Sequence, residues 1–286
     1  MTRTTGFEVT HHTRYRFSEP ASGSVLMCCL KPCEDRGQEL RAFSLQTRPE
    51  SRATDDVDCF GNHRHVLSLL EKHDQLEIEA RSVVVPAPDP VLPADLGENA
   101  WERLHAASRV FEDWEWLHPT RLTCPSASLT AFVERHAIAP GADPLAGTRD
   151  LSTRLHRILT YVPGSTSTQS TIEDVLATGQ GVCQDYAHLM IAITRSWGIP
   201  SRYVSGFLYD DSEEGGYHTT HAWVECRFPD VGWTGFDPTN DSVAGALHVR
   251  IAAGRDFSDV SPTRGILLGG CRTTLDVDVR IRPAGG

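Results

Sequence analysis

Hydrophobic and polar residues alternate along the first 85 residues of the chain. Between residues 7 and 17, the odd positions from Phe7 to Phe17 share one face of a predicted strand. Further extended segments, separated by turn-forming residues, lie at 25–31, 40–48, 55–60, 63–70 and 76–85. Between two of them, Gly61-Asn62 is typical of a hairpin turn. Short strands at this spacing predict an antiparallel β-sandwich.

The pattern changes after residues 86–98, a segment that holds Pro86, Pro88, Pro90 and Pro93. Such a segment is typical of a domain boundary, so we predict a β-domain over residues 1–92 and a second domain over residues 93–286. Helical periodicity predicts helices over 100–117, 126–137, 147–162 and 183–197. Alternation returns after Pro200 and predicts strands over 202–209, 218–228, 233–237 and 274–282. The predicted fold class is therefore α+β.

The helix predicted at 183–197 begins with a cysteine after a glycine-flanked turn at 179–182. Its apolar face repeats every three to four residues, and Gly198 and Pro200 mark its end. The Cys183 thiol is thus expected at the N-terminus of a buried helix, where unpaired backbone N–H groups favour a thiolate and can hold an oxyanion. The alternative is that Cys183 is a packing residue, because cysteine is among the most buried residue types.

A histidine and an aspartate follow on later predicted strands, in His221-Ala-Trp-Val-Glu225 and in Trp233-Thr-Gly-Phe-Asp237. A cysteine at a helix start, then a histidine and an aspartate, is the order of a thiol catalytic triad. Cys183 is then the nucleophile, His221 the base, and Asp237 the group that orients His221. The alternative for Asp237 is that Asp-Pro only begins a turn. Other candidate bases are His188 and His218, both expected at the surface, and His248.

The two strands of this predicted hairpin must put His221 and Asp237 on the same sheet face. In an antiparallel pair this happens only when the numbers of opposed residues sum to an even number, as 221 and 237 do. We therefore predict a loop of odd length that pairs Arg227 with Trp233, or an even loop corrected by a bulge.

The segment 179–240 resembles the core of the bacterial transglutaminase-like family, part of the papain-like superfamily. The matching motifs are Gly-Val-Cys-Gln-Asp-Tyr-Ala-His-Leu at 181–189, Gly198-Ile-Pro-Ser-Arg-Tyr-Val-Ser-Gly206, His-Ala-Trp-Val-Glu at 221–225 and Gly-Trp-Thr-Gly-Phe-Asp-Pro-Thr-Asn at 232–240. His11-x-Thr13-x-Tyr15 and Asp58-Cys-Phe-Gly-Asn62 resemble the family's N-terminal β-domain, and residues 254–262 resemble its C-terminal segment. The resemblance implies a β-sandwich followed by a papain-like core, with the nucleophile at a helix N-terminus packed on an antiparallel sheet.

The triad and the resemblance together imply thiol-dependent acyl transfer at amide bonds. Cys183 attacks a carboxamide or peptide carbonyl and forms a thioester. Water as the acceptor makes the protein a peptidase or amidase, and an amine makes it a transglutaminase. The expected partner is a peptide, protein or small amide substrate. The alternative function is a non-catalytic scaffold that binds proteins or peptides and retains the fold.

The oxyanion of such a reaction needs hydrogen-bond donors, and the backbone N–H of Cys183 is the first candidate. Gln180 and Tyr161 are candidates for the second donor, and Trp223 is a tentative substrate-binding residue. The alternatives are a solvated or structural role for Gln180 and Tyr161, and a core or cleft wall for Trp223. Asp185 is expected to be a structural carboxylate that caps the helix or orients a neighbouring loop, because its charge suits the helix dipole but would oppose a thiolate.

Composition limits the kinds of binding partner and the cellular location that we expect. The net charge of −11 argues against nucleic acid and anionic membrane surfaces. The N-terminus lacks the apolar segment of a signal peptide, and no stretch reaches the roughly 20 apolar residues of a membrane span, so we expect a cytoplasmic protein. Eight cysteines without a CxxC pair predict reduced thiols. No metal or cofactor is expected, since the cluster Cys28, Cys29 and Cys33 fits no zinc spacing.

Overall fold

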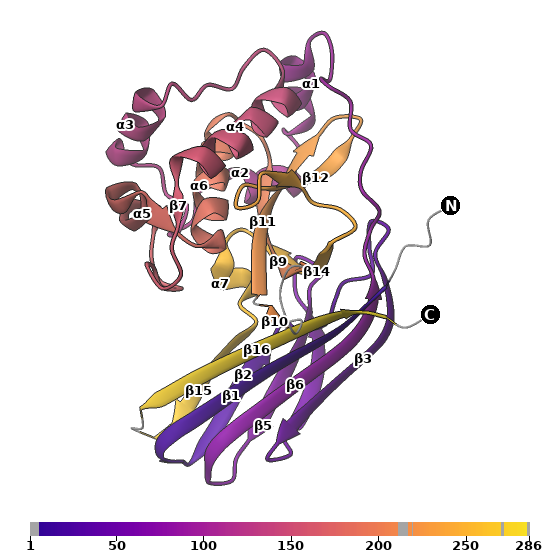
Figure 1. Cartoon of the computed structure of the whole chain (residues 1–286), viewed down its shortest axis with the longest axis vertical. Helices are drawn as coiled ribbons and strands as arrows, with labels where there is room; N and C mark the ends of the chain where they lie inside the picture. Colours follow the sequence, from indigo (N-terminus) through magenta and orange to yellow (C-terminus); the bar gives the residue numbers. More distant parts are fainter. Residues whose placement is uncertain (1–5, 211–216, 219, 270–271, 285–286) are drawn as a thin grey trace.

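The computed structural model describes residues 6–210, 217–218, 220–269 and 272–284 (Figure 1). Its N-terminal region is a sandwich of two antiparallel sheets. The larger sheet has, in spatial order, β10 (Tyr217–His218), β16 (Thr273–Pro283), β1 (Phe7–Ala21), β6 (His73–Val85) and β3 (Glu39–Arg48). The smaller sheet has β15 (Thr263–Leu268), β2 (Gly23–Cys28), β5 (His63–Leu69) and β4 (Arg52–Val57). Leu26 and Leu67 of one sheet meet Leu76 and Ile78 of the other in a common core, so the predicted sandwich is confirmed.

Strand β1 lies where the alternation of hydrophobic and polar residues predicted a strand. Burial alternates along it, with Phe7, Val9, His11 and Thr13 buried and the residues between them more exposed. The predicted hairpin turn is also present between β4 and β5. Its residues are held by the Asp58 carboxylate, which accepts hydrogen bonds from the backbone N–H groups of residues 60 and 62, both at 2.9 Å.

The C-terminal strands differ from the predicted domain boundary. We expected residues 93–286 to form one domain, but β16 pairs with β1 from Phe7↔Pro283 to Phe17↔Thr273. Strand β15 likewise pairs with β2 in the smaller sheet. The end of the chain therefore returns to the sandwich that its beginning starts. Alternation in the tail predicts a strand, but it carries no information about which strand becomes its partner.

The segment between strand β6 and residue 200 is mostly helical. Its helices are α1 (Ala100–Ala107), η1 (Phe111–Asp113), α2 (Trp114–Leu117), α3 (Ala127–Arg135), α4 (Pro144–Ile158), α5 (Ile172–Thr178) and α6 (Cys183–Ser196). The predicted helix over 100–117 is interrupted at Ser108, whose side chain bonds the Leu104 carbonyl at 2.8 Å. Helix α4 begins earlier than predicted, because Asp143 accepts from the backbone N–H groups of its first turn. No described helix is both long and apolar enough to cross a membrane.

A third antiparallel sheet, outside the sandwich, lies against helix α6. Its strand order is β13 (Ser242–Val243), β12 (Gly232–Asp237), β11 (Thr220–Phe228), β9 (Ser201–Leu208) and β14 (His248–Gly254). One face of β11, formed by Ala222, Val224 and Cys226, belongs to the same buried core as Met190 and Ile191 of α6. Short strands β7 (Thr160–Tyr161) and β8 (Gln180–Gly181) pair in parallel just before α6, and helix α7 (Phe257–Val260) follows β14.

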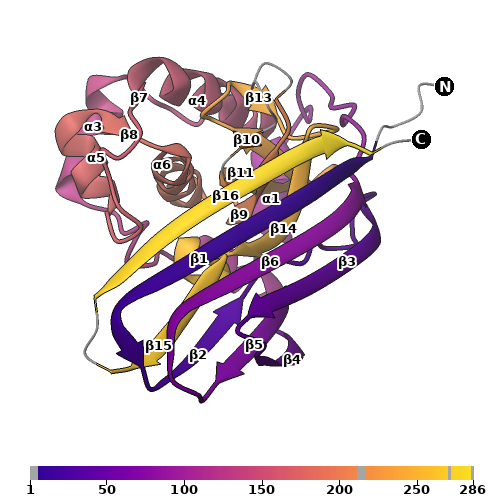
Figure 2. The same cartoon turned by 60° about the horizontal axis from the view of Figure 1, so that its bottom comes forward.

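The long strands of the larger sandwich sheet serve two cores. Phe17 and Leu76 pack inside the sandwich, whereas Val9, Val84 and Ile281 pack into the core around α6. Figure 2 shows β16 and β1 running along the underside of the helical region. One half of the sheet therefore closes the sandwich, and the other half lies against the core around α6.

Candidate active site

Cys183 is the first residue of helix α6, and its thiol is partly exposed. Asp185 lies in the first turn, is buried, and accepts a hydrogen bond from the Val182 N–H at 2.8 Å and from the Thr166 hydroxyl at 2.5 Å. Burial raises the pKa of Asp185, and these hydrogen bonds partly offset the effect. Asp185 thus stabilises the helix start, as predicted. Gly181 is required beside it, because a Cβ there would lie 2.8 Å from the Asp185 Cβ.

Strands β11 and β12 bring His221 and Asp237 together. Their register pairs Arg227 with Trp233 and Val224 with Phe236 across a three-residue loop at 229–231. The predicted odd-length loop and register are therefore confirmed. The two catalytic candidates share a sheet face, and His221 Nε2 lies 2.7 Å from Asp237 Oδ2. Asp237 is fully buried, and the His221 side chain is 11% exposed.

His221 also lies beside the Cys183 thiol: the two side chains line the same cavity, and Cys183 is among the groups that raise the pKa of His221. Because Nε2 faces Asp237, the nitrogen that meets the thiol is Nδ1. Burial alone lowers the pKa of His221, but the charge and hydrogen bond of Asp237 and the contact with Cys183 raise it to about 10. Burial likewise opposes the charge of Asp237, yet His221 and other donors hold the pKa of that carboxyl far below its usual range. His221 is therefore an imidazolium at neutral pH.

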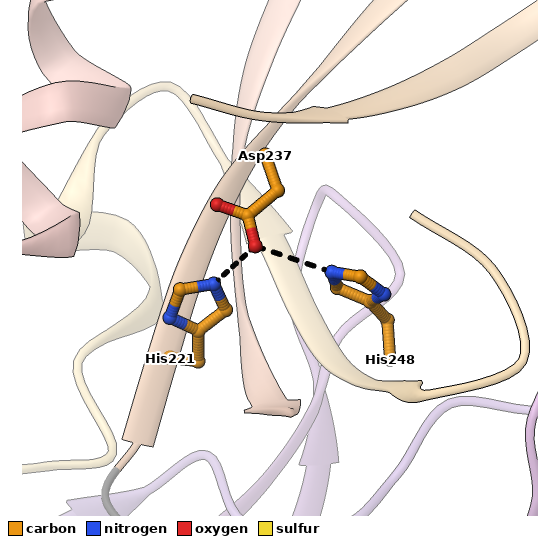
Figure 3. A group of neighbouring side chains, drawn as sticks. All are labelled: His221, Asp237 and His248. Carbon is orange, nitrogen blue, oxygen red and sulfur yellow. Dashed lines mark hydrogen bonds and ion pairs between the residues drawn. The ribbon is translucent and has the colours of Figure 1, made fainter. Parts of the chain in front are cut away.

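Two further residues hold Asp237 in place: Asn240, for which no role was predicted, and His248, which was predicted only as an alternative base. Asn240 donates from Nδ2 to Asp237 Oδ2 at 2.7 Å, and His248 Nε2 lies 3.3 Å from the same oxygen. Figure 3 shows His221 and His248 pointing at Asp237 from two sides. The other carboxylate oxygen accepts from the backbone N–H groups of Thr239 and Asn240 at 3.0 and 3.3 Å. The sequence Asp-Pro-Thr-Asn forms this local turn, and its pattern could have predicted that Asn240 lies beside Asp237. His248 reaches the site from β14 at the far edge of the sheet, and no local sequence pattern predicts its contact with Asp237.

His221, Asp237 and His248 could also hold a metal ion. One possible ligand atom from each lies within 4.8 Å of the others. Two imidazoles and a carboxylate are a zinc-like donor set, but ligands about 2.0–2.1 Å from a tetrahedral zinc lie about 3.3 Å apart. The His221–Asp237 separation of 2.7 Å is shorter than that and is a normal hydrogen-bond distance. The distances among His221, Asp237 and His248 are therefore those of a hydrogen-bonded network.

Cys183 and His221 open into a cavity of about 480 Å³. Tyr161 lines this cavity and is half exposed, and its pKa is raised by burial and by Cys183 nearby. Gln180 is exposed and lies outside the cavity lining, whereas the buried side chain of Gln184 belongs to it. Trp223 is buried and is not among the residues that line this cavity; its ring stacks on His221 at a centroid distance of 6.2 Å.

Of the other candidate bases, His248 contacts Asp237, whereas His188 lies elsewhere. His188 was expected at the surface, but it is buried, and its Nε2 accepts from the Phe257 N–H at 3.2 Å. Burial lowers its pKa to about 4, so it is neutral and structural. The expectation failed because α6 is enclosed on nearly all sides by the sheet and the other helices. The side chain of His218 lies outside the described part of the chain.

Comparison with known proteins supports a common ancestry for both regions. Residues 133–238 match the model of the transglutaminase-like superfamily, and residues 7–85 match the bacterial transglutaminase-like N-terminal region. An uncharacterized protein of Mycobacterium leprae is 31% identical over 277 residues, which cover 96% of this chain and 97% of that protein. A protein-glutamine gamma-glutamyltransferase of Pseudomonas aeruginosa is 33% identical over 86 residues, 28% of this chain and 13% of that protein.

A solved structure has the same fold along the whole chain. It is a Cytophaga hutchinsonii protein proposed to be a cysteine protease, and it aligns with a TM-score of 0.77. The alignment covers 99% of this chain and 91% of that one. With 19% sequence identity, this likeness concerns the fold alone.

Proposed function

The chain belongs to the transglutaminase-like superfamily, and we propose that it catalyses thiol-dependent acyl transfer or hydrolysis at amide bonds. In this proposal Cys183 is the nucleophile, His221 the acid–base, and Asp237 the group that orients His221. The observation that carries it is the position of His221, which bonds Asp237 at 2.7 Å through Nε2 and meets the Cys183 thiol with its other nitrogen.

The first half-reaction forms a thioester. The thiol proton resides on His221 Nδ1, and the Cys183 sulfur attacks the carbonyl carbon of the amide. The carbonyl π electrons move to oxygen, where the backbone N–H of Cys183 at the start of α6 stabilises the negative charge. As the tetrahedral intermediate collapses, the C–N bond breaks and His221 gives its proton to the leaving amine. Asp237 holds the imidazolium in the required orientation throughout.

The second half-reaction releases the acyl group. His221 is then neutral and removes a proton from water or from an amine as that acceptor attacks the thioester carbon. The C–S bond breaks, and the proton returns to the Cys183–His221 pair. Water yields a carboxylic acid and an amine yields a new amide. The cytoplasmic location and the peptide, protein or small-amide partner are part of this proposal.

The experiment uses benzyloxycarbonyl-glutaminyl-glycine as the amide, with and without hydroxylamine as the amine acceptor. Mass spectrometry distinguishes the hydrolysed acid from the hydroxamate. We expect Cys183→Ala to lower turnover by about 10³-fold or more without changing the melting temperature. Cys124→Ala is the matched control, because Cys124 is a free, exposed thiol.

The rival is a scaffold that binds peptides without chemistry. Iodoacetamide labelling followed by peptide mass spectrometry separates the two. The proposal requires Cys183 to be alkylated faster than the exposed Cys124 near pH 6.5, because the positively charged His221 lies beside the Cys183 sulfur. Equal rates at the two cysteines, together with no turnover of the amide, would favour the scaffold.

A further inference from the structure

The cavity in front of Cys183 has walls from both parts of the molecule. One wall belongs to the catalytic region and includes Tyr161 and Phe257. The opposite wall comes from the sandwich sheet, through His11 and Thr13 of β1 and Leu275 and Val277 of β16. These two strands are paired, with Thr13 opposite Val277. A substrate that reaches Cys183 through this cavity therefore touches the N-terminal β-domain.

We propose that the sandwich sheet completes the acyl-binding pocket, that the pocket takes an uncharged acyl segment, and that His11 supplies a hydrogen bond to it. This inference rests on the proposed function and names the substrate class for the same site.

His11 is placed like a binding group without a partner. Its side chain is buried, and its Nδ1 lies 3.3 Å from the Thr13 hydroxyl. Its Nε2 is also buried and has no hydrogen-bond partner among the residues that the structure describes. Buried polar atoms are almost always paired. Because the residue His11 belongs to the cavity lining, the proposal assigns the missing partner of Nε2 to the ligand.

The charge state of His11 fits a neutral ligand. Burial, reinforced by the neighbouring His12, lowers the pKa of His11 to about 4. The ring is therefore uncharged at neutral pH and offers either a donor or an acceptor at Nε2, according to its tautomer. Such a group can bond a carboxamide, a hydroxyl or a peptide group.

The rest of the lining has the same character. Apart from the catalytic His221, no Asp, Glu, Lys, Arg or charged His lines the cavity within the described ranges. Leu275, Val277 and Tyr161 are each about half exposed there. Away from the catalytic pair Cys183 and His221, a charged side chain in this pocket would lose hydration without gaining an opposite charge. The cavity volume of about 480 Å³ lies within the usual range for a small-ligand site.

The test uses chloromethyl ketones of benzyloxycarbonyl-norleucine, -lysine and -glutamate, because norleucine and lysine differ mainly in charge. In each case the Cys183 sulfur displaces chloride and forms a thioether, which intact-mass spectrometry follows with time. We expect norleucine to label Cys183 at least about tenfold faster than lysine or glutamate. The overall charge of −11 attracts the lysine probe, so slower labelling by it cannot come from the general field of the protein. Labelling by a charged probe as fast as by norleucine would overturn the proposal.

The role of His11 is tested by His11→Phe, which keeps a ring and removes both nitrogens. Labelling by the norleucine probe should fall by about tenfold, labelling by iodoacetamide should stay unchanged, and His11→Gln should recover part of the rate. The matched control is His12→Phe on the opposite face of β1, where His12 Nε2 lies 3.8 Å from Glu77. Wild-type norleucine rates in a folded His11→Phe protein would overturn the role of His11. If His11→Phe does not fold, the norleucine labelling rate of His11→Gln is compared with that of wild type. An unchanged rate would then overturn the role of His11, and the probe series still tests the charge preference of the pocket.

Failure of the underlying function gives a different result. Charge-selective labelling of Cys183 without turnover of any amide would overturn the catalytic proposal and leave the pocket assignment standing. A Cys183 that reacts with neither the probes nor iodoacetamide would overturn both.

Discussion

Replacement of Asp237 by Asn is the sharpest test of the triad. Asn has the same shape and can still accept the backbone hydrogen bonds from Thr239 and Asn240. It has no negative charge, however, and its amide can donate to His221 Nε2. That hydrogen bond would move the imidazole proton to Nδ1, the nitrogen that must receive the proton of the Cys183 thiol.

The size of the effect follows from the electrostatics of His221. Burial lowers its pKa, and the charge of Asp237 is the main influence that raises it to about 10 instead. Without that charge the pKa should fall to the ordinary value of 6.5 or lower. A fall from about 10 to 6.5 corresponds to about 5 kcal/mol of lost imidazolium stabilisation. If the transition state depends on that stabilisation, turnover decreases by about 10³–10⁴-fold.

The pair should also contribute to stability in a defined pH window. The pKa of His221 is raised in the folded state, so its contribution is complete below pH 6.5 and is lost as pH rises towards 10. The pKa of Asp237 is lowered, so its contribution is present above pH 3.8 and is lost in more acidic solution. The difference in unfolding free energy between wild type and Asp237→Asn should therefore be largest between pH 3.8 and 6.5.

Steady-state amide turnover and urea unfolding at several pH values measure the two effects. Asp230→Asn is the control, because Asp230 lies in the loop of the same hairpin and its side chain is 78% exposed. A folded Asp237→Asn protein that retains turnover within tenfold of wild type would show that Asp237 does not orient the base. A stability difference that is constant from pH 5 to pH 10 would refute the electrostatic account of His221.

Three further substitutions test the surroundings of the site. Asn240→Ala removes the 2.7 Å hydrogen bond to Asp237, and we expect kcat to fall by about ten- to a hundredfold with little change in KM; an unchanged kcat would mean that Asn240 does not position Asp237. Gly181→Ala brings a Cβ to 2.8 Å from that of Asp185, so urea unfolding should show a loss of about 1–3 kcal/mol, while Gln180→Ala at the exposed neighbour should be neutral. Glu225→Gln breaks a buried cluster in which Arg202 and Arg36 each lie 2.6 Å from the carboxylate, and should cost about 3–5 kcal/mol at pH 7. Burial opposes the charge of Glu225, but the neighbouring arginines lower its pKa to about 2, so this cost should persist above pH 4.5 and decrease as pH falls towards 2. An equal cost at pH 7 and pH 2 would contradict this explanation.

Local patterns were enough to predict the elements that carry the candidate triad. Cys183 could be placed at a helix start because glycines precede it and an apolar face follows it. If His221 and Asp237 share a face, strand parity requires a loop of odd length, and the register of β11 and β12 agrees with it. Each of these inferences depends on residues less than about 20 positions apart, where backbone geometry leaves few choices.

Features that depend on distant parts of the chain could not be predicted in this way. The contact of His248 with Asp237 requires β14 to lie beside β9, and the burial of His188 requires the packing of the sheet around α6. The pairing of β16 with β1 joins residues more than 250 positions apart. Alternation identifies a strand, but many strands satisfy the same alternation, so the partner is decided by the tertiary fold.

The return of the tail to the first strand has a consequence for how the protein is made. Strand β1 lies in the middle of the larger sheet, and its partner β16 is synthesised more than 250 residues after it. While the ribosome translates the intervening chain, one hydrogen-bonding edge of β1 remains uncovered and can pair with other chains. The same tail carries Leu275 and Val277, part of the cavity wall opposite Cys183. A nascent chain that already contains Cys183, His221 and Asp237 therefore lacks a complete pocket until translation has passed residue 283.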